Sequence, residues 1–463
     1  MIQNIKYFQM KKINIKITTL FILFFACLSC NKQLDIKPTQ SVENSEALLT
    51  SNDVEAALVG SYSDLVDFDM YGGGIFVCAD LLGDNNELEW SGTYQGMTQI
   101  YTKSIPVDNQ FVSDTWLAGY TAINDVNNVL GALDVVLDEK KDRVEGEAKF
   151  IRGACLFDLV RMFGKAWNDG NPSTNPGVPI VLTATTIITG ESQLPRNTVA
   201  EVYAQAIKDL KDAEALLPAE NGFFANSVAA SAMLARIYLQ QGDYENAANS
   251  ANKAITDALD NGYGLNAKYA DEFPNPSSPA PVPNTPEDLF AMQVTTSSGT
   301  NVFQEFYSAN GRGDIAISDK HLDLYEPGDD RLNLFYTSGG STYTGKFENL
   351  YGNVHILRLA EMYLVRAEAN FRMGTSIGAD PVDDINTIRN RVNLPDYTSG
   401  ELTLDKILLE RKLELAFEGF TLHDLKRTES AAGVFNWNDP KLVYPIPQRE
   451  LRVNANLTQN EGY

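Results

Sequence analysis

The sequence predicts a mainly α-helical protein in which helical hairpins form a scaffold and one long, loop-rich insertion interrupts them. Apolar residues recur at spacings of three and four in much of residues 52–260 and again in 355–463, which places them on one face of a helix. Residues 261–354 are instead rich in Pro, Gly, Ser, Thr, Asn and Tyr. With 463 residues, the chain is long enough for such a scaffold and its core.

The first helices are predicted from apolar stripes and from one start signal. Residues 145–163 carry such a stripe, and residues 198–201 form a capping box that starts a helix ending before Pro218. Residues 72–74 and the polar, aromatic stretch 84–94 are expected to be loops. The two earliest stripes consist of Val54, Ala57, Leu58 and Tyr62, and of Trp116, Tyr120, Ile123, Val126 and Leu130.

Two segments resemble tetratricopeptide helical hairpins, in which small residues lie where two helices cross. In residues 229–259, alanines mark the crossing, and Gly242 begins the turn. A second hairpin is predicted to start at Leu357, with Gly374 in its turn. Because the two hairpins lie far apart in the sequence, we expect a curved scaffold with a large insertion rather than a regular solenoid.

The insertion, residues 261–354, is expected to form long loops with little regular structure. Its proline-rich part, 274–283, cannot be helical, and residues 289–294 are typical of a short strand. Loops of this length are usually functional or disordered, and the aromatic residues here argue against disorder.

The N-terminal residues predict export and lipid attachment. Three lysines between residues 11 and 16 precede an apolar run, 18–29, which is typical of a secretory signal and too short for a membrane span. Ser29 before Cys30 resembles a bacterial lipobox, so we expect Cys30 to be acylated and to become the mature N-terminus. Cys27 occupies the position where Leu is usual, and a plain signal peptide cleaved nearby is the alternative.

Charge and motif content exclude several functions. The formal net charge of −24 makes nucleic acid a poor partner, because phosphate backbones would be repelled. The cysteines after Cys30, Cys78 and Cys155, do not make a disulfide framework. There is no CxxC, HExxH or histidine cluster, so we expect neither a metal site nor a cofactor.

An ordered set of motifs over nearly the whole mature chain resembles the SusD/RagB family of outer-membrane nutrient-binding lipoproteins of Bacteroidetes. The early motifs are SCNKQLDIKP at 29–38, EAKFIR at 147–152 and FG at 163–164. The later motifs are ILRLAEMYLVRAEA at 356–369, INTIRNR at 385–391, ERKLELAFEG at 410–419, DLKR at 424–427, YPIP at 444–447 and QNEGY at 459–463.

The resemblance implies a tetratricopeptide-type scaffold with an irregular ligand face that covers a SusC-type, TonB-dependent transporter in the outer membrane. It implies an oligosaccharide ligand, held by aromatic rings and polar groups without chemistry, and a lipid anchor at the cell surface. The corresponding parts are the signal peptide 1–29, the anchor and tether 30–51, the N-terminal helical part 52–260, the insertion 261–354 and the C-terminal helical part 355–463.

Glu410, Glu414 and Glu418 recur at intervals of four residues and share one helix face. A glycosidase would use two such carboxylates as acid and nucleophile. We favour ion pairs with the arginines of the C-terminal part, because a charged group near a core needs a partner.

Two loops combine aromatic and polar residues in the way that a sugar site requires, since rings offer apolar platforms while amides and charged groups bind hydroxyls. The family's ligand contacts do not lie in its motifs, so these candidates rest on composition alone. The first group is Asp84, Asn85, Asn86, Trp90 and Tyr94. The second group is Phe306, Tyr307, Asn310 and Arg312, whose alternative role is to form the core of their loop.

Three other functions stay open. The first is capture of peptides or glycopeptides, which occurs in the same family. The second is a glycoside hydrolase, which needs two carboxylates free of arginine partners across a cleft. The third is a tetratricopeptide adaptor, which would show an open concave groove in place of a face covered by loops.

Overall fold

The computed structural model describes residues 48–463, apart from 188, 298 and 300. The predicted signal segment, the Cys27 and Cys30 positions and most of the tether lie outside the described residues. Thr50–Tyr463 form one unit, and both of its cysteines, Cys78 and Cys155, are buried free thiols. Within the described ranges, no helix combines the length and the apolarity that crossing a bilayer requires.

The fold is mainly helical, with short strands in antiparallel pairs. The α-helices are α3 (Ser51–Leu65), α4 (Gly74–Gly83), α5 (Gln95–Tyr101), α6 (Gln110–Gly131), α7 (Asp138–Phe163), α8 (Val199–Leu216), α9 (Ser227–Gln241), α10 (Tyr244–Asp260), α11 (Val302–Tyr307), α12 (Asp319–Leu322), α13 (Leu359–Met373), α14 (Pro381–Asn390), α15 (Leu404–Glu414), α16 (Thr421–Arg427) and α17 (Gln448–Val453). The strands are β1 (Leu88–Trp90), β2 (Asp288–Met292), β3 (Ile315–Ile317), β4 (Phe335–Ser338), β5 (Ser341–Thr344) and β6 (Val354–Arg358). Short 3₁₀ helices are η1 (Leu133–Val135), η2 (Gly190–Ser192), η3 (Tyr269–Glu272), η4 (Asp330–Leu334), η5 (Gly345–Phe347) and η6 (Pro440–Leu442).

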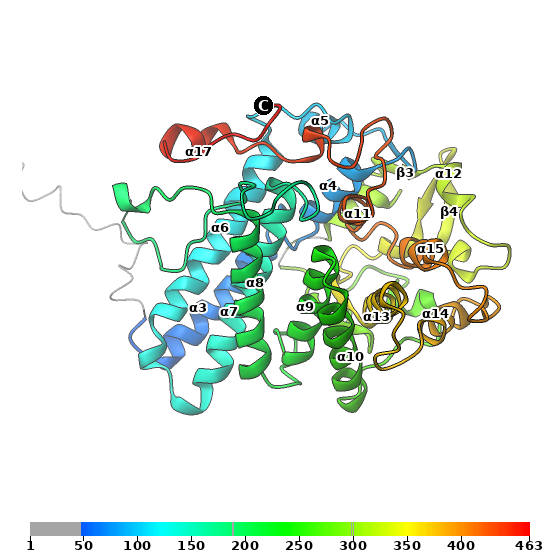
Figure 1. Ribbon diagram of the computed structural model, residues 1–463, viewed down its shortest axis with the longest axis horizontal. Coiled ribbons are helices and arrows are strands. Elements are labelled where there is room, and N and C mark those ends of the chain that lie inside the picture. Colours follow the sequence, from blue (N-terminus) through cyan, green and yellow to red (C-terminus); the bar gives the residue numbers. More distant parts are fainter. Residues whose placement is uncertain (1–47, 188, 298, 300) are drawn as a thin grey trace, which may run out of the picture. The chain divides into compact units, whose positions relative to one another are not determined.

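The scaffold is a row of helices in which each packs on the next. Contacts run from α6 to α7, α8, α9 and α10, then directly to α13 and α14 (Figure 1). The predicted hairpins are confirmed as α9–α10 and α13–α14. Their first helices end at Gly242 and Gly374, whose φ angles of 72° and 67° favour glycine because a side chain there would be strained. The capping box at Thr198 is also present.

The insertion leaves the row after α10 and returns to it before α13, so that the two hairpins stack although about a hundred residues separate them. Strands β2 and β6 pair antiparallel at the two ends of the insertion and hold it closed. The predicted strand at 289–294 is confirmed as the buried β2. Residues 354–358, whose last two were expected to begin the helix, form β6 instead, since pairing with β2 satisfies their backbone groups.

The stretch 84–94, predicted to be a loop, contains the three-residue strand β1. It pairs with β3 in the insertion, with Leu88 opposite Ile317 and Trp90 opposite Ile315. A strand this short has little signal of its own, and its partner lies more than two hundred residues further along the chain. This pairing fixes the relative positions of the two predicted ligand loops.

The predicted ion pairs of the C-terminal glutamates are confirmed, and they are buried. Glu410 lies 3.3 Å from Arg389 of the C-terminal part and 2.7 Å from Arg331 of the insertion, while Glu418 lies 2.8 Å from Arg358 and 2.6 Å from Lys346. Glu414 contacts Arg358 at 3.1 Å and also pairs with Arg391. These carboxylates are therefore not available as a catalytic pair, because arginine or lysine already holds each one.

We predict that Glu418→Gln destabilises the fold in a pH-dependent manner. Burial alone would raise the pKa of Glu418, but Arg358 and Lys346 outweigh it and lower the pKa to about 2. The ionised carboxylate therefore stabilises the fold above the pKa of the unfolded chain, and this stabilisation disappears as pH falls toward 2.

At neutral pH we expect Glu418→Gln to lower the free energy of unfolding by about 3–5 kcal/mol, since it removes the carboxylate that pairs with buried Lys346 and one of those that pair with Arg358. Urea denaturation followed by circular dichroism at several pH values measures this, and the difference from wild type should narrow in acid. Asp257→Asn, at an exposed pair with Lys253, is the control and should change the free energy of unfolding by less than about 1 kcal/mol. A difference that stays constant with pH would contradict the role of the ionised carboxylate.

Candidate ligand-binding site

The segment between α4 and α5 carries Trp90 and Tyr94, two of the aromatic residues expected to contact ligand. Trp90 ends β1, and Tyr94 directly precedes α5. The Asp84 carboxylate holds the start of this segment by accepting hydrogen bonds of 2.9–3.0 Å from the backbone N–H groups of residues 86–88. Asp84 is 4% exposed, and the structure therefore gives it a backbone-capping role in place of the expected ligand contact.

The pairing of β1 with β3 brings the two predicted loops together. The backbone N–H of Ser91 donates to the carbonyl of Asp314 at 2.8 Å. This continues the β1–β3 ladder into the loop 308–314, which carries Asn310 and Arg312. Residues far apart in the sequence thus meet at one face, to which the first loop contributes Trp90 and Tyr94.

Trp90 is a half-buried ring that is fixed on three sides. Its indole Nε1–H donates to Thr98 Oγ1 at 2.8 Å, and its ring packs against Phe306 with centroids 6.1 Å apart. Gly92 passes so close that a Cβ atom there would lie 2.4 Å from indole Cζ2. The orientation of the ring is thus set before any ligand arrives.

Tyr94 and Arg312 form a stacked pair at the surface. The guanidinium Cζ lies 4.3 Å from the centroid of the tyrosine ring, a cation–π arrangement. Arg312 is held in this position because its Nε donates to Asp314 at 2.7 Å and its Nη2 donates to Thr93 at 3.0 Å. Tyr94 is 39% exposed, so the pair presents a polar, aromatic surface to solvent.

Phe306 and Tyr307 belong to the loop core and do not reach solvent. Both are 0% exposed, which removes them from the ligand contacts expected from the sequence. Phe306 instead packs beneath Trp90 and Tyr94, with both ring centroids 6.1 Å away, and the Tyr307 hydroxyl donates to Asp80 at 3.2 Å. These residues support the ligand face from below.

Asn85 and Asn86 have separate surroundings. Asn85 Oδ1 accepts a hydrogen bond of 3.0 Å from the backbone N–H of Gly433 and lines a cavity of about 250 Å³ beside α15 and α16. Asn86 is exposed and has a φ angle of 60°. Much of the cavity wall is apolar, from residues such as Leu408 and Phe417, and its charged groups are largely paired with one another. This cavity therefore resembles a sugar site less than the surface formed by Trp90, Tyr94 and Arg312 does.

The hairpin β4–β5 adds residues that the sequence analysis missed. Tyr336 and Tyr343 lie opposite each other across the hairpin, with ring centroids 5.9 Å apart, and Tyr343 contacts the loop that carries Arg312 through Gly313. The turn is Gly339–Gly340, with φ angles of 60° and 91°. Two glycines between alternating aromatic and threonine residues are a hairpin signal that could have located these tyrosines.

Glu348 links this hairpin to Asn310. Its carboxylate accepts from Asn310 Nδ2 at 2.7 Å and from the Tyr336 hydroxyl. An ionised carboxylate has about four acceptor positions, so Glu348 keeps capacity for a ligand hydroxyl. Beyond Tyr336 and Glu348 lies an open groove of about 530 Å³, which Asn275 and Asn333 also line.

The site therefore consists of the loop 308–314 with an aromatic pair on each side. One pair is Trp90 and Tyr94, the other Tyr336 and Tyr343. Arg312, Asn310 and Glu348 supply hydrogen-bonding groups near the rings. Such a face can bind a neutral, hydroxyl-rich ligand by stacking and hydrogen bonding.

Comparisons with known proteins agree across the chain. Residues 32–239 match a family model described as starch-binding and associating with the outer membrane, and residues 332–443 match the model of the SusD family. SusD-like protein P2 of Formosa agariphila is 24% identical over 98% of this chain and 100% of its own length. The starch-binding protein SusD of Bacteroides thetaiotaomicron is 32% identical over 24% of this chain and 22% of its own.

Solved structures show the same fold. A SusD superfamily protein from Bacteroides thetaiotaomicron is 26% identical and superposes with a TM-score of 0.79, covering 89% of this chain and 99% of the other. Another from Bacteroides vulgatus is 25% identical, also with a TM-score of 0.79 and the same coverage. The helical row and its insertion are therefore shared by these proteins.

We predict that Gly92→Ala displaces the Trp90 indole, because the new methyl group would occupy the space of its ring. In a ¹⁵N-labelled sample, the Trp90 indole N–H resonance, assigned by its loss in Trp90→Phe, should shift, and its hydrogen exchange should accelerate. Gly131→Ala is the matched control, since a Cβ there meets nothing within 4 Å. An unchanged indole resonance in Gly92→Ala would show that Gly92 does not position this ring.

Proposed function

The chain belongs to the SusD/RagB family, and from this premise we propose that it is a carbohydrate-binding lipoprotein of the outer cell surface. It captures an oligosaccharide and passes it to a SusC-type, TonB-dependent transporter in the outer membrane. The description of the first family model as starch-binding and outer-membrane-associated supports the ligand class and the location. The name of the Bacteroides thetaiotaomicron relative, starch-binding protein SusD, agrees with that ligand class.

The single observation that carries this proposal is the exposed aromatic face at the loop 308–314. Trp90 and Tyr94 are rigid, and Arg312 stacks on Tyr94 with hydrogen-bond donors at its edge. Sugar rings present C–H groups on their faces and hydroxyls around their rims. Aromatic planes match those faces, while Arg312, Asn310 and Glu348 match the hydroxyls.

Binding without hydrolysis is favoured by the state of the carboxylates. Glu410, Glu414 and Glu418 are held by buried cations. At the ligand face, Glu348 already accepts hydrogen bonds from Asn310 and Tyr336, and Asp314 is paired with Arg312. A glycosidase needs two carboxyl groups poised as acid and nucleophile or base, whereas Glu348 is the one carboxylate among these five that no arginine or lysine holds.

Attachment to the membrane is assigned to Cys30, which lies outside the described residues. Several acyl chains on one cysteine would anchor the protein stably, whereas one chain would bind only marginally.

We predict that Trp90→Ala and Tyr94→Ala each weaken oligosaccharide binding by about tenfold or more, equivalent to about 1.4 kcal/mol. The reason is that each variant removes a stacking platform and leaves the scaffold intact. Isothermal titration calorimetry with starch-derived maltooligosaccharides, and then with a panel of other neutral oligosaccharides, measures the change. Phe223→Ala is the control, because Phe223 is an exposed ring on another loop.

In cells that depend on the transporter, the same two variants should slow uptake of the bound oligosaccharide at limiting concentration. The glycan assignment fails if no oligosaccharide in the panel binds. Peptide binding that is lost in Trp90→Ala and Tyr94→Ala would instead support capture of peptides at this face.

We also predict that Cys30→Ser moves the protein from the membrane fraction to the soluble fraction and abolishes labelling with a palmitate analogue. Cys27→Leu is the matched control, since it brings the lipobox closer to the usual pattern and should keep the protein membrane-bound. If Cys30→Ser stays in the membrane fraction, the anchor lies elsewhere.

A further inference from the structure

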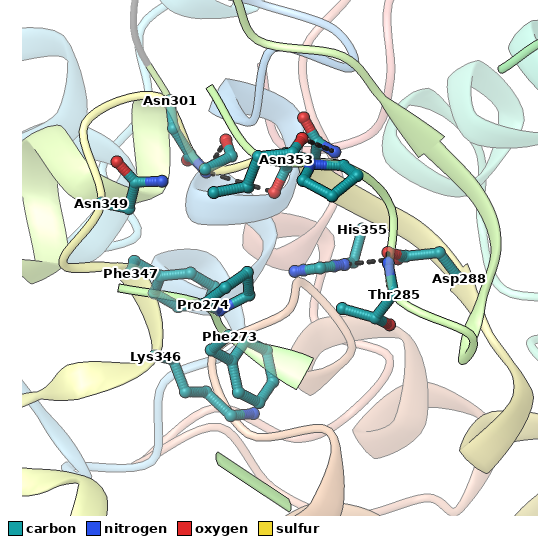
Figure 2. A pocket seen from close by; sticks show the side chains of 13 residues that line it. Phe273, Pro274, Thr285, Asp288, Asn301, Lys346, Phe347, Asn349, Asn353 and His355 are labelled. Atoms are coloured by element: carbon teal, nitrogen blue, oxygen red, sulfur yellow. Dashed lines mark hydrogen bonds and ion pairs between the residues drawn. The ribbon is translucent and has the colours of Figure 1, made fainter. Parts of the chain in front are cut away.

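Three side chains from distant parts of the chain converge near the two ends of the insertion. Glu272 ends η3, Asp288 begins β2, and His355 lies on β6. The His355 Nδ1 atom lies 2.6 Å from Asp288 Oδ1 and 3.3 Å from Glu272 Oε1. All three ligand atoms lie within 4.8 Å of one another, and Figure 2 shows His355 directed toward Asp288.

Glu272 is the residue that this cluster leaves unsatisfied. It is 0% exposed, and its Oε2 accepts hydrogen bonds from Asn266 Nδ2 at 2.7 Å and from Thr285 Oγ1. Within the described part of the chain, its Oε1 has no hydrogen-bond partner, although it faces His355 and Asp288. A buried carboxylate oxygen without a partner is costly, so something is expected to occupy the space that it faces.

The charge around Glu272 favours a cation in that space. The carboxylates of Glu272, Asp288 and Glu287 are all buried, and Asn266 donates hydrogen bonds to both Glu272 and Glu287. Glu287 is already paired with Arg358 and Arg391, so Glu272 and Asp288 are the carboxylates left for a further positive charge. Either a proton or a metal ion could supply it.

A small cavity adjoins this cluster. Figure 2 shows the outer edge of the His355 ring facing a small space beside Phe273, Pro274 and Asn353. Its volume is about 10 Å³, which is close to the room that one water molecule needs, so a sugar or a phosphate group does not fit there. The cavity lining includes Asp288 and His355 but not Glu272, so an ion held by all three side chains would lie beside the cavity.

We propose that Glu272, Asp288 and His355 form a structural site for a divalent transition-metal ion, with Zn²⁺ as its probe. An imidazole nitrogen with two carboxylate oxygens is a ligand set that suits zinc, and two carboxylates neutralise its charge. Tetrahedral ligands at about 2.0–2.2 Å from zinc lie about 3.3 Å apart. The 3.3 Å between His355 and Glu272 matches this spacing, whereas the 2.6 Å between His355 and Asp288 would have to widen. Calcium and magnesium fit poorly, because they require six or more oxygen ligands.

Such an ion would tie the insertion to the scaffold. Glu272 and Asp288 precede the main loops of the insertion, and His355 follows them, so one ion would join both ends across the β2–β6 pair. The sequence carries no sign of this site, since the three residues are separated by tens of residues and form no spacing motif. It departs from the expectation that the chain binds no metal.

The test compares metal content and melting temperature of the EDTA-treated mature protein after dialysis against Zn²⁺, Ca²⁺ or Mg²⁺. We expect one Zn²⁺ per chain by mass spectrometry. At a hundredfold excess over the dissociation constant, we expect a rise in Tm of about 3 °C or more with Zn²⁺ and none with Ca²⁺ or Mg²⁺. His355→Gln and Glu272→Gln should each lose both effects.

His321→Gln is the matched control, because His321 is also buried and paired with a glutamate, Glu87, but no third ligand accompanies it among the residues that the structure describes. Its zinc-dependent Tm rise should remain, whatever its basal Tm. If the site variants fail to fold, wild type loaded with Co²⁺ provides the test. Co²⁺ in a tetrahedral site absorbs strongly in the visible range, and added Zn²⁺ should displace it and abolish this absorption. Wild type that retains no Zn²⁺ would overturn the proposal. If Glu272→Gln is then at least as stable as wild type, a proton occupies the site.

Discussion

The buried charge network around Arg358 is the interaction on which the arrangement of this protein depends. Arg358 ends β6 and lies 2.6 Å from Glu287, 3.1 Å from Glu414 and 2.8 Å from Glu418. Glu287 belongs to the insertion, whereas Glu414 and Glu418 belong to the C-terminal helical part. These three carboxylates also contact Lys346, Arg391 and Arg331, so each buried carboxylate has more than one cationic partner.

This network explains how a long loop-rich segment keeps one conformation on a helical scaffold. Apolar contacts would hold the insertion against the scaffold without fixing its exact position. A guanidinium has donors in a fixed geometry, so it pairs only with carboxylates at matching positions. Lys346 carries the constraint further, because its ammonium group reaches the carbonyl of Ala416 at 2.8 Å as well as Glu418. The segments that carry the ligand face are therefore anchored at both ends, and the face is built between fixed points.

The sequence predicts most of the scaffold because helix signals are local. The apolar stripes, the capping box at Thr198 and the glycines that end α9 and α13 all act within a few residues. Strand β1 could not be predicted, because its three residues form a strand only by pairing with β3, which lies in another part of the chain. The end of β6, at Leu357 and Arg358, differs from the predicted helix for the same reason, since its apolar residues continue directly into α13.

The candidate site could be predicted only in part, because composition identifies aromatic residues without stating which of them reach solvent. Trp90, Tyr94 and Arg312 meet at one face, but Phe306 and Tyr307 are buried by contacts that form only in the folded chain. The Gly339–Gly340 turn is a hairpin signal from which Tyr336 and Tyr343 could have been predicted. Among the partners of Arg358, Glu414 and Glu418 share a predicted helix face, whereas Glu287 had no signal, since it lies 71 residues away and nothing local selects it.

The separation between a charged interior and an aromatic face has a consequence for how the protein works. Because Phe306, Thr98 and Asp314 hold Trp90 and Arg312 in place, little side-chain freedom is lost when a ligand stacks on them. The groups that would contact a ligand lie at the surface, so a ligand bound there could also leave. The proposed transfer of ligand to a transporter requires this combination of a rigid surface and weak individual contacts. A deeply enclosed site would hold the ligand too long, and a mobile loop would reduce affinity by the cost of ordering it.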